Sequence, residues 1–225
     1  MTHYKESRFT LRDDFYFHTL TALEEVLSSK KIPYAVVGGG AYQVKMTSLL
    51  SDGGIIDIKD VHGLDVILRP TGDIDLTTKS DHSTMLSVFN EMAARYPALN
   101  INNTAGKLVR IKHPGKGQVL INYQTCSDDL RGLTLFYDEI IDTSEEHALR
   151  KGNKRVYVKI PRPEFLIASK LIRSAEKDKI DIFNLLNLFF NKGTSVNFEE
   201  VRGILKAIGK EDKFEYIQQI NYDLQ

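Results

Sequence analysis

The chain has 225 residues, 42% of them apolar, which is enough to bury a substantial core in one large domain or in a main domain with a helical appendage. Thirty basic residues balance thirty acidic ones, which excludes a global positive field, so any contact with a polynucleotide has to come from a local patch. The single cysteine, Cys126, excludes an intramolecular disulfide framework and a multi-cysteine zinc site, and it favours a reducing setting. No stretch reaches the roughly 18 uninterrupted apolar residues of a membrane span, so we expect a cytoplasmic protein without a membrane partner.

Apolar spacing, glycines and prolines predict the elements of the first half of the chain. In chain order these are a helix over 13–31, a strand over 34–37, a glycine turn over 38–40, a helix over 41–50 and a loop or hairpin insertion over 51–63. Strands over 64–68 and 73–78 follow. Ser80 is then predicted to cap a helix that runs to about residue 95, with Met85, Val88, Phe89 and Met92 on its apolar face.

The second half of the chain changes from β-type alternation to helical periodicity. Alternating apolar residues predict a β-hairpin over 99–125 with its turn at 113–117. Segments 134–141 and 155–160 are predicted as two edge strands, although the first fits a short helix equally well.

Pro161 and Pro163 mark a shift in composition, beyond which every segment is predicted as helix. The four helices cover 164–175, 178–191, 199–208 and 212–220, and Asn197 with Glu200 resembles a capping box. This order predicts an α/β (α+β) protein in two parts: a mixed β-sheet flanked by helices over 1–160, and a C-terminal helical bundle over 161–225.

Gly38, Gly39 and Gly40 separate a predicted strand from a predicted helix. A glycine turn at this place lets the backbone approach a phosphate closely and directs the positive end of the helix dipole toward it. The spacing matches neither the P-loop nor the dinucleotide-binding motif, and taken alone it is better explained by a purely conformational glycine turn.

Asp73 and Asp75 are separated by one residue on a predicted strand, so both side chains project from the same face, about 6.5 to 7 Å apart along the chain. Two carboxylates at that spacing can hold Mg²⁺ ions that align an attacking hydroxyl and a leaving pyrophosphate. The same pattern is common on solvated strand edges, so the surrounding sequence has to decide between the two interpretations.

The surrounding sequence carries a resemblance to a known superfamily. A glycine pair that closes a strand, followed by Arg69-x-Thr71-x-Asp73-Ile74-Asp75-Leu76, resembles the signature of polymerase-β-like nucleotidyltransferases. The Arg-x-Thr-x-Asp-x-Asp form is especially similar to the AbiEii-type branch, the toxins of abortive-infection and type IV toxin–antitoxin systems.

A second motif matches the same branch downstream. Its helical Lys…Arg…Asp-x-x-Asp pattern is similar to Lys170, Arg173, Lys177-Asp178 and Asp181. Placed on one helix, Lys170, Ser174, Asp178 and Asp181 fall near one stripe at spacings of four, four and three, so they can share a cleft. Without the upstream motif, such a stripe is typical of an ordinary solvated charged face.

The resemblance implies a nucleotidyltransferase fold over 1–160, an NTP as substrate and Mg²⁺ or Mn²⁺ as cofactor. It also implies roles by position. Gly38 and Gly39 would face the triphosphate, Arg69 and Thr71 would bind nucleotide, Asp73 and Asp75 would hold the metal and act in catalysis, Lys170 would reach a phosphate, and Asp178 would contact the nucleotide or orient the other groups.

The chain departs from the superfamily at the third acidic position. A third carboxylate normally comes from a strand beside the one that bears the Asp pair, and the corresponding residue here is Asn122. A neutral amide can neither act as a general base nor replace the charge of a carboxylate on a metal. Asp128 is the alternative acid, and a site that binds nucleotide without turnover is the alternative function.

Two hypotheses follow from these residues. The first is an enzyme that transfers a nucleoside monophosphate to a hydroxyl of RNA, protein or a small molecule, with a possible cognate antitoxin as partner. The second is a degenerate relative that binds nucleotide or a partner without catalysis, which Asn122 favours. The basic stretches 107–116 and 150–155 either follow an RNA backbone or protect sheet edges from pairing.

Overall fold

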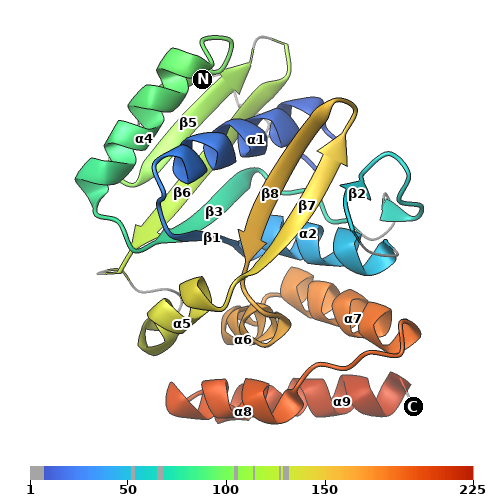
Figure 1. The fold of residues 1–225 in the computed structure, drawn as a ribbon. Helices are drawn as coiled ribbons and strands as arrows, with labels where there is room; N and C mark the ends of the chain where they lie inside the picture. The colour runs from blue at the N-terminus through green and yellow to red at the C-terminus, as the bar shows by residue number, and fades with distance from the viewer. Residues whose placement is uncertain are drawn as a thin grey trace, which may run out of the picture.

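A computed structural model describes residues 8–224 apart from 52–53, 65–67, 104–105, 114, 127 and 129–131. The chain forms two mixed β-sheets with helices packed around them (Figure 1). The larger sheet has the order β1-β3-β6-β5-β4 and the smaller one β2-β7-β8. Their strands are β1 (Tyr34–Val37), β2 (Ile56–Asp57), β3 (Asp73–Thr78), β4 (Asn100–Asn103), β5 (Leu108–His113), β6 (Gly117–Thr125), β7 (Glu145–Lys151) and β8 (Lys154–Ile160).

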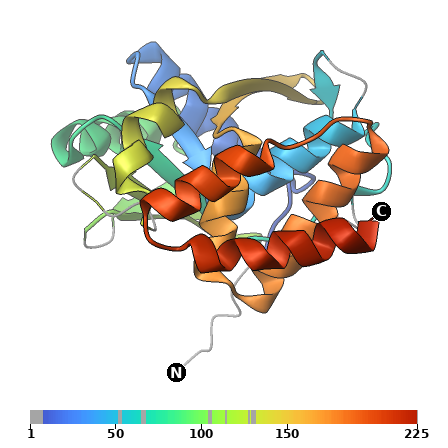
Figure 2. The ribbon, with the colours of Figure 1, turned by 90° about the horizontal axis from the view of Figure 1, so that it is seen from below.

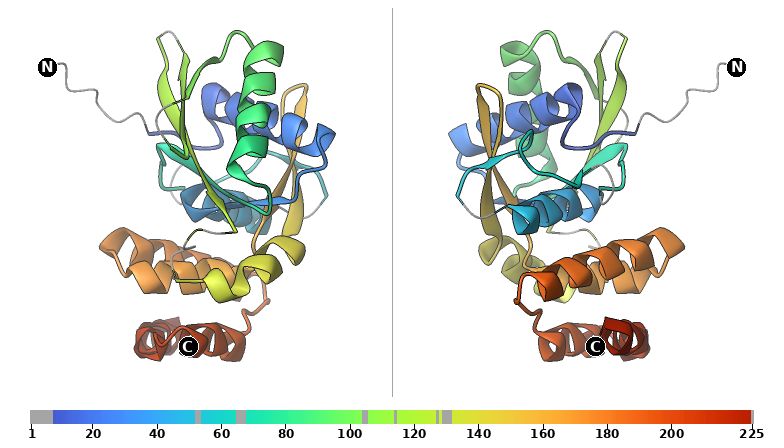
Figure 3. Two further views of the ribbon diagram at one scale, coloured as in Figure 1. Left: turned by 90° about the vertical axis from the view of Figure 1, so that its left-hand side faces the viewer. Right: turned by 90° about the vertical axis from the view of Figure 1, so that its right-hand side faces the viewer.

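Helices α1 (Asp14–Ser29) and α4 (His82–Arg95) lie on one face of the five-stranded sheet, and no described helix lies over the opposite face (Figure 3). The alternation of β3 explains this arrangement. Ile74 and Leu76 are buried on the helix side, whereas Asp73 and Asp75 are half-buried on the open side. Burial of one such aliphatic side chain contributes about 1.5–3 kcal/mol, which fixes the register of the strand and therefore the face on which the aspartates lie.

The remaining helices complete the core and form the layers below the large sheet. They are α2 (Gly38–Leu50), α5 (Tyr137–Asp142) with the 3₁₀-helix η1 (Thr134–Phe136) before it, α6 (Pro163–Arg173), α7 (Glu176–Asn191), α8 (Phe198–Ala207), and α9 (Glu215–Leu224) with the 3₁₀-helix η2 (Glu211–Phe214) before it. Seen from below, α8 and α9 lie nearest the viewer, beneath α6 and α7 (Figure 2).

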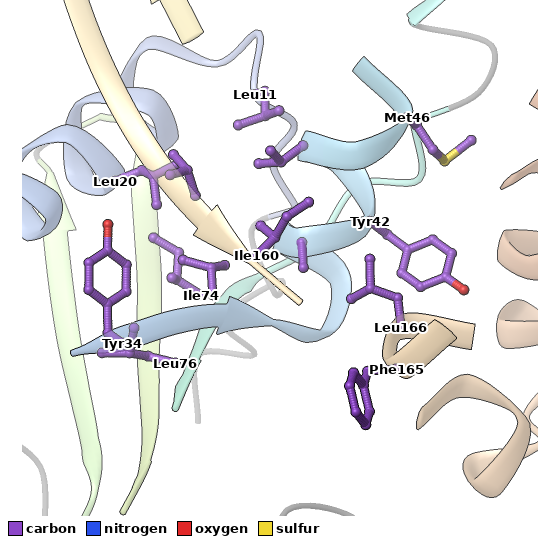
Figure 4. Packing of buried hydrophobic residues seen from close by; sticks show 14 of the residues in the cluster. Leu11, Leu20, Tyr34, Tyr42, Met46, Ile74, Leu76, Ile160, Phe165 and Leu166 are labelled. Atoms are coloured by element: carbon purple, nitrogen blue, oxygen red, sulfur yellow. The ribbon is translucent and has the colours of Figure 1, made fainter. Parts of the chain in front are cut away.

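One continuous apolar cluster joins the sheets to the C-terminal helices. In Figure 4, Leu20 of α1, Tyr34 of β1, Ile74 of β3 and Ile160 of β8 lie on one side of α2, and Phe165 of α6 lies on the other. The fold therefore holds α6 against the end of β1 and the start of α2. None of the described helices is both long and apolar enough to cross a membrane.

The structure confirms the predicted fold class and most of the predicted elements. The strand over 34–37, the strand over 73–78 and the β5–β6 hairpin lie as expected, as do the four C-terminal helices. One half of the expected capping box is present, because the Asn197 side chain accepts a hydrogen bond from the Glu200 backbone N–H at 3.2 Å. The division into 1–160 and 161–225 stays a prediction.

Two local predictions are wrong, and one alternative that the sequence left open is decided. The helix α4 is capped by Asp81 and not by Ser80, because the Asp81 carboxylate accepts the Thr84 N–H at 2.7 Å. Segment 134–141 is helical, as the alternative allowed. Of the strand expected over 64–68, Leu64 is helical and the Leu68 N–H donates to its carbonyl at 2.7 Å, while 65–67 lie outside the described residues.

Candidate active site

The glycines after β1 form the first turn of α2, and Gly38 and Gly39 make room for side chains on β3 and just before it. Gly38 has φ +65°, and a Cβ added there would lie 2.1 Å from Oδ2 of Asp75. A Cβ on Gly39 would lie 3.0 Å from Oγ1 of Thr71. Because the first N–H groups of a helix have no partner within it, this contact places an anion-attracting helix end against the carboxylate of Asp75.

Asp73 and Asp75, the acidic pair, are held by short polar contacts on the open face of the large sheet. Oγ1 of Thr71 donates to Oδ1 of Asp73 at 2.6 Å. On the neighbouring parallel strand β6, Asn122 is in register with Asp75, and its Nδ2 donates to Oδ1 of Asp75 at 3.4 Å. The carboxylates are thus oriented by a hydroxyl and an amide.

Tyr16 of α1 supports the acidic pair from the buried side. Its hydroxyl donates to the backbone carbonyl of Asp73 at 3.3 Å, and a Cβ on Gly40 would lie 2.9 Å from the same hydroxyl. Burial, and next the charges of Asp73 and Asp75, raise the pKa of Tyr16 well above its usual value. Tyr16 therefore stays protonated and acts as a donor beneath the strand.

Four charged residues of α6 and α7, the buried ion-pair cluster, lie below the acidic pair: Lys170, Arg173, Asp178 and Asp181. Nζ of Lys170 lies 3.2 Å from Oδ1 of Asp178 and also contacts Asp181, and the side chain is 0% exposed. It lies 4.4 Å from the centroid of the Tyr42 ring. Arg173 pairs with Asp178 through two hydrogen bonds.

The pKa values of the buried ion-pair cluster follow from burial and from these contacts. Burial lowers the pKa of Lys170, and the charges of Asp181 and Asp178 oppose that change. Burial raises the pKa of Asp178, but the hydrogen bond from Arg173 and the charge of Lys170 outweigh it, so the net pKa lies below the usual value. The hydrogen bond to Asp178 raises the pKa of Arg173, and Asp75 contributes to the same change.

Arg69 connects the buried ion-pair cluster to the acidic pair. Its guanidinium binds Asp181 in a bidentate manner, with Nε at 3.2 Å from Oδ1 and Nη2 at 2.9 Å from Oδ2. Arg69 also lines a cavity of about 310 Å³ together with Arg8, Thr71, Asp73, Gln118 and Lys177. Residues from the start of the described chain, from β3 and β6 and from α7 therefore meet beside Asp73.

The structure corrects the expectation that one helix carries Lys170, Ser174, Asp178 and Asp181. Ser174 adopts φ +51° and ends α6, and α7 begins only at Glu176. Lys170, Asp178 and Asp181 still meet, because the two helices pack against each other, whereas the Ser174 hydroxyl donates to the Leu171 carbonyl. Lys170 is not one of the residues that line the cavity beside Asp73, and its role toward a phosphate stays a prediction.

Asn122 lies where the sequence places the third acidic position, beside Asp75 on the adjacent strand. The alternative acid, Asp128, lies beyond the far end of β6, where it pairs with Lys107 and accepts the Thr125 N–H at 2.6 Å. Among the described residues, no three Asp, Glu, His or Cys side chains are grouped so that they could hold a metal. Asp129 lies outside the described residues.

The residues of the site fit Mg²⁺ or Mn²⁺ bound jointly with phosphate. Two carboxylates and an adjacent amide provide the oxygen ligands that Mg²⁺ prefers, and Mg²⁺ commonly takes only one or two carboxylates when phosphates supply further ligands. The missing side chain at Gly38 makes room for the Asp75 carboxylate against the start of α2.

Sequence reasoning missed several residues of the site. Tyr16 was expected only as part of an apolar helix face, and Arg8 was not considered. Lys177 and Arg173 belong to the downstream motif, but neither received a role. The sequence around Gln118 contains no acidic residue. It does not show that Gln118 lies near Asp73, because that position depends on the parallel pairing of β3 with β6.

Comparisons with solved structures find several similar chains. The chain matches an antigenic nucleotidyltransferase-like protein from Paracoccidioides brasiliensis with a TM-score of 0.50 and 19% identity, over 93% of this chain and 95% of that chain. It also matches JHP933 from Helicobacter pylori (TM-score 0.48, 13% identity, 96% of this chain and 95% of that chain) and lincomycin-bound LnuA, a lincosamide antibiotic adenylyltransferase (0.39, 15%, 79% and 98%). No model of a protein family and no curated protein matches the sequence. The mixed sheets, the C-terminal helices and the match to the Paracoccidioides brasiliensis protein together show that the chain has the nucleotidyltransferase fold.

Proposed function

We propose that the protein transfers a nucleoside monophosphate from an NTP to an acceptor hydroxyl with the help of Mg²⁺ or Mn²⁺. The proposal rests on the close contact between the start of α2 and Asp75. A Cβ added to Gly38 would lie only 2.1 Å from Oδ2 of Asp75. A helix N-terminus attracts phosphate, whereas two carboxylates repel it unless a cation lies between them. A metal–NTP complex suits both groups, since its phosphates can bind the helix N-terminus and its metal ion can bind the two carboxylates.

Each residue has a role that its contacts support. Gly38 and Gly39 face the triphosphate, Thr71 orients Asp73, and Asp73 and Asp75 hold the metal. The metal supplies charge neutralisation and Lewis acidity at the phosphate. Arg69, which lines the cavity beside Asp73, binds the nucleotide, with Asp181 fixing its guanidinium.

Lys170 and Asp178 are positioning residues in this proposal. The Lys170 ammonium group is fully buried between Asp178 and Asp181, and we infer that it acts through them in place of the phosphate contact that the motif resemblance implies. Asp178 holds Arg173 at the end of α6, and Asp181 holds Arg69, so the cluster fixes the positions of two guanidinium groups.

The proposed step is an in-line substitution. The acceptor oxygen forms a bond to the α-phosphorus, the bond from that phosphorus to the pyrophosphate oxygen breaks, and the hydroxyl proton leaves to water. Asn122 cannot accept that proton, so in the proposed step water and not this side chain takes it.

Label transfer tests the proposed function. The pure protein is incubated with Mg²⁺, each α-labelled NTP and total cell RNA or protein, and we expect label in one acceptor fraction. Asp73→Asn should reduce the transfer by about 1000-fold or more, because it removes a metal-binding charge. Asp142→Asn, which removes an exposed acid paired with Lys79, should leave it unchanged. Transfer that survives in Asp73→Asn would rule the proposal out.

Binding without turnover is the second candidate function. The contact from Asn122 to Asp75 favours it, because an amide occupies the place of a third carboxylate. In that case, NTP should raise the melting temperature only with Mg²⁺ or Mn²⁺ present, Asp73→Asn should abolish this coupling, and no acceptor should be labelled.

A role as the toxin of a toxin–antitoxin pair rests on the motif resemblance alone. Induced expression should then arrest growth, and Asp73→Asn should relieve the arrest. Growth that is unaffected by the wild-type protein would remove this role and leave the transfer reaction untouched.

A further inference from the structure

The open face of the five-stranded sheet continues outward from the acidic pair as an ordered polar surface. Because side chains alternate along a strand, residues in register across strands share a face. One row runs from Asp73 through Leu120 and Arg110 to Asn102. Rows on either side of it run through Asn122 and Leu108, and through Gln118, Lys112 and Asn100. We call these residues of β4, β5 and β6 the outer sheet face.

The outer sheet face is positively charged in a protein that has no net charge. The segment 97–127 contains no acidic residue and includes Lys107, Arg110, Lys112 and Lys116. Lys107 is neutralised by Asp128. No described residue forms an ion pair with Arg110 or Lys112, and no described residue accepts a hydrogen bond from the buried Nε of Arg110. The positive charge of this surface is therefore not compensated within the described part of the chain.

Two further cations extend this charge to the acidic pair. Arg8 and Lys177 line the cavity beside Asp73, together with Gln118 and Leu120 of the outer sheet face. The cavity and the outer sheet face are thus continuous. The Cα atom of Arg110 is two strand spacings, about 10 Å, from that of Asp73, so a chain molecule bound across the strands reaches the acidic pair within a short distance.

We propose that the outer sheet face binds a single-stranded polynucleotide and delivers its terminal hydroxyl to the acidic pair. This inference rests on the proposed transfer function and names its acceptor. The cationic side chains can pair with the phosphates of the backbone, and these are Arg8, Arg110, Lys112 and Lys177. Nδ2 of Asn102 donates to Oδ1 of Asn100 at 2.9 Å, and the further donor and acceptor positions of these two amides can bind base edges and ribose hydroxyls, which an acidic peptide would not need. A cationic small-molecule acceptor would be repelled by the same charges.

Binding of a short fluorescent oligouridylate tests this surface directly, without NTP or turnover. We expect Arg110→Gln and Lys112→Gln each to weaken binding about fivefold at 0.1 M salt, and each to reduce the slope of log K against log salt by about 0.7. The matched control is Arg155→Gln, which removes an exposed cation from β8 in the other sheet and should change neither quantity. Lys112→Gln keeps the test valid if Arg110→Gln fails to fold.

The metal-dependent thermal shift by NTP, measured on the same variants, separates this inference from the proposed function. We expect the shift to be unchanged in Lys112→Gln. A wild-type protein without that shift would count against nucleotidyl transfer and leave the oligouridylate result standing. The inference is overturned if the wild type does not bind oligouridylate at low salt, if Arg155→Gln weakens binding as much as Lys112→Gln, or if polyglutamate competes as well as RNA.

Discussion

The acidic pair and the buried ion-pair cluster both consist of charged residues near the same cleft, but they differ in how their charges are balanced. In the cluster, two cations face two aspartates, and the Lys170 and Asp178 side chains are 0% exposed. Asp73 and Asp75 are half-buried on the open sheet face, and Thr71 and Asn122 offer them neutral partners. The cluster is therefore held by direct ion pairs, whereas neutral groups donate the hydrogen bonds described for the acidic pair. This difference distinguishes the supporting scaffold from the proposed reactive centre.

Removal of the Lys170 charge gives the largest expected effect, because it breaks the balance of the cluster. Lys170→Met leaves Asp178 and Asp181 as buried charges with fewer partners, which should cost about 3–5 kcal/mol of unfolding free energy in a denaturant titration. Lys79→Met is the matched control, since Lys79 also faces two aspartates, Asp138 and Asp142, but at the surface. Similar losses in the two variants would show that the cluster is no more than a solvated charged face.

A side chain at Gly38 should disturb the acidic pair itself. Gly38→Ala combines a left-handed backbone with a Cβ that displaces the Asp75 carboxylate, and we expect a loss of about 2–4 kcal/mol together with loss of metal-dependent NTP binding. Gly203→Ala is the matched control, because no atom lies within 4 Å of its Cβ position and it lies inside α8. That substitution should stabilise the protein by about 0.5–1 kcal/mol.

Replacement of Asn122 by aspartate should increase the difference in charge between the acidic pair and the buried ion-pair cluster. Asn122→Asp adds negative charge beside Asp75, so without metal we expect the variant to fold with a loss of about 1 kcal/mol. It should bind Mg²⁺ more tightly than the wild type, as isothermal titration would measure, and transfer should rise if the rest of the site is competent. A larger loss of stability with unchanged Mg²⁺ affinity would show that Asn122 has a structural role.

A fall in pH should reduce the contribution of the buried ion-pair cluster to the stability of the fold. The folded-state pKa of Asp178 is lowered, so its contribution is fully present above the unfolded-state value of about 3.9 and is lost as pH falls through the lower folded-state value. Between about pH 5 and pH 2, the stability of the wild type should therefore fall more steeply than that of Asp178→Asn. Parallel curves would show that Asp178 is not stabilised as a carboxylate.

The sequence predicts the acidic pair well because strand alternation and a local motif both act over a few residues. It predicts a break between helices 164–175 and 178–191 but not its position at Ser174, since no glycine or proline marks that residue. The strand β7 was missed because its sequence, EEHALRK, shows little apolar alternation, and pairing with β8 stabilises it. Asp81 and Ser80 are both good capping residues, so only the chain path decides between them.

The contacts that complete the site also set when it can form. Asp75 and Asn122 are 47 residues apart along the chain, and Arg69 and Asp181 are 112 apart. Contacts this distant in sequence form late and slowly in folding, because long loops must close before they can contribute. On the ribosome, the acidic pair is synthesised early but gains its full set of partners only after α7 has emerged. A nascent chain therefore carries the metal-binding aspartates well before it has the complete nucleotide site.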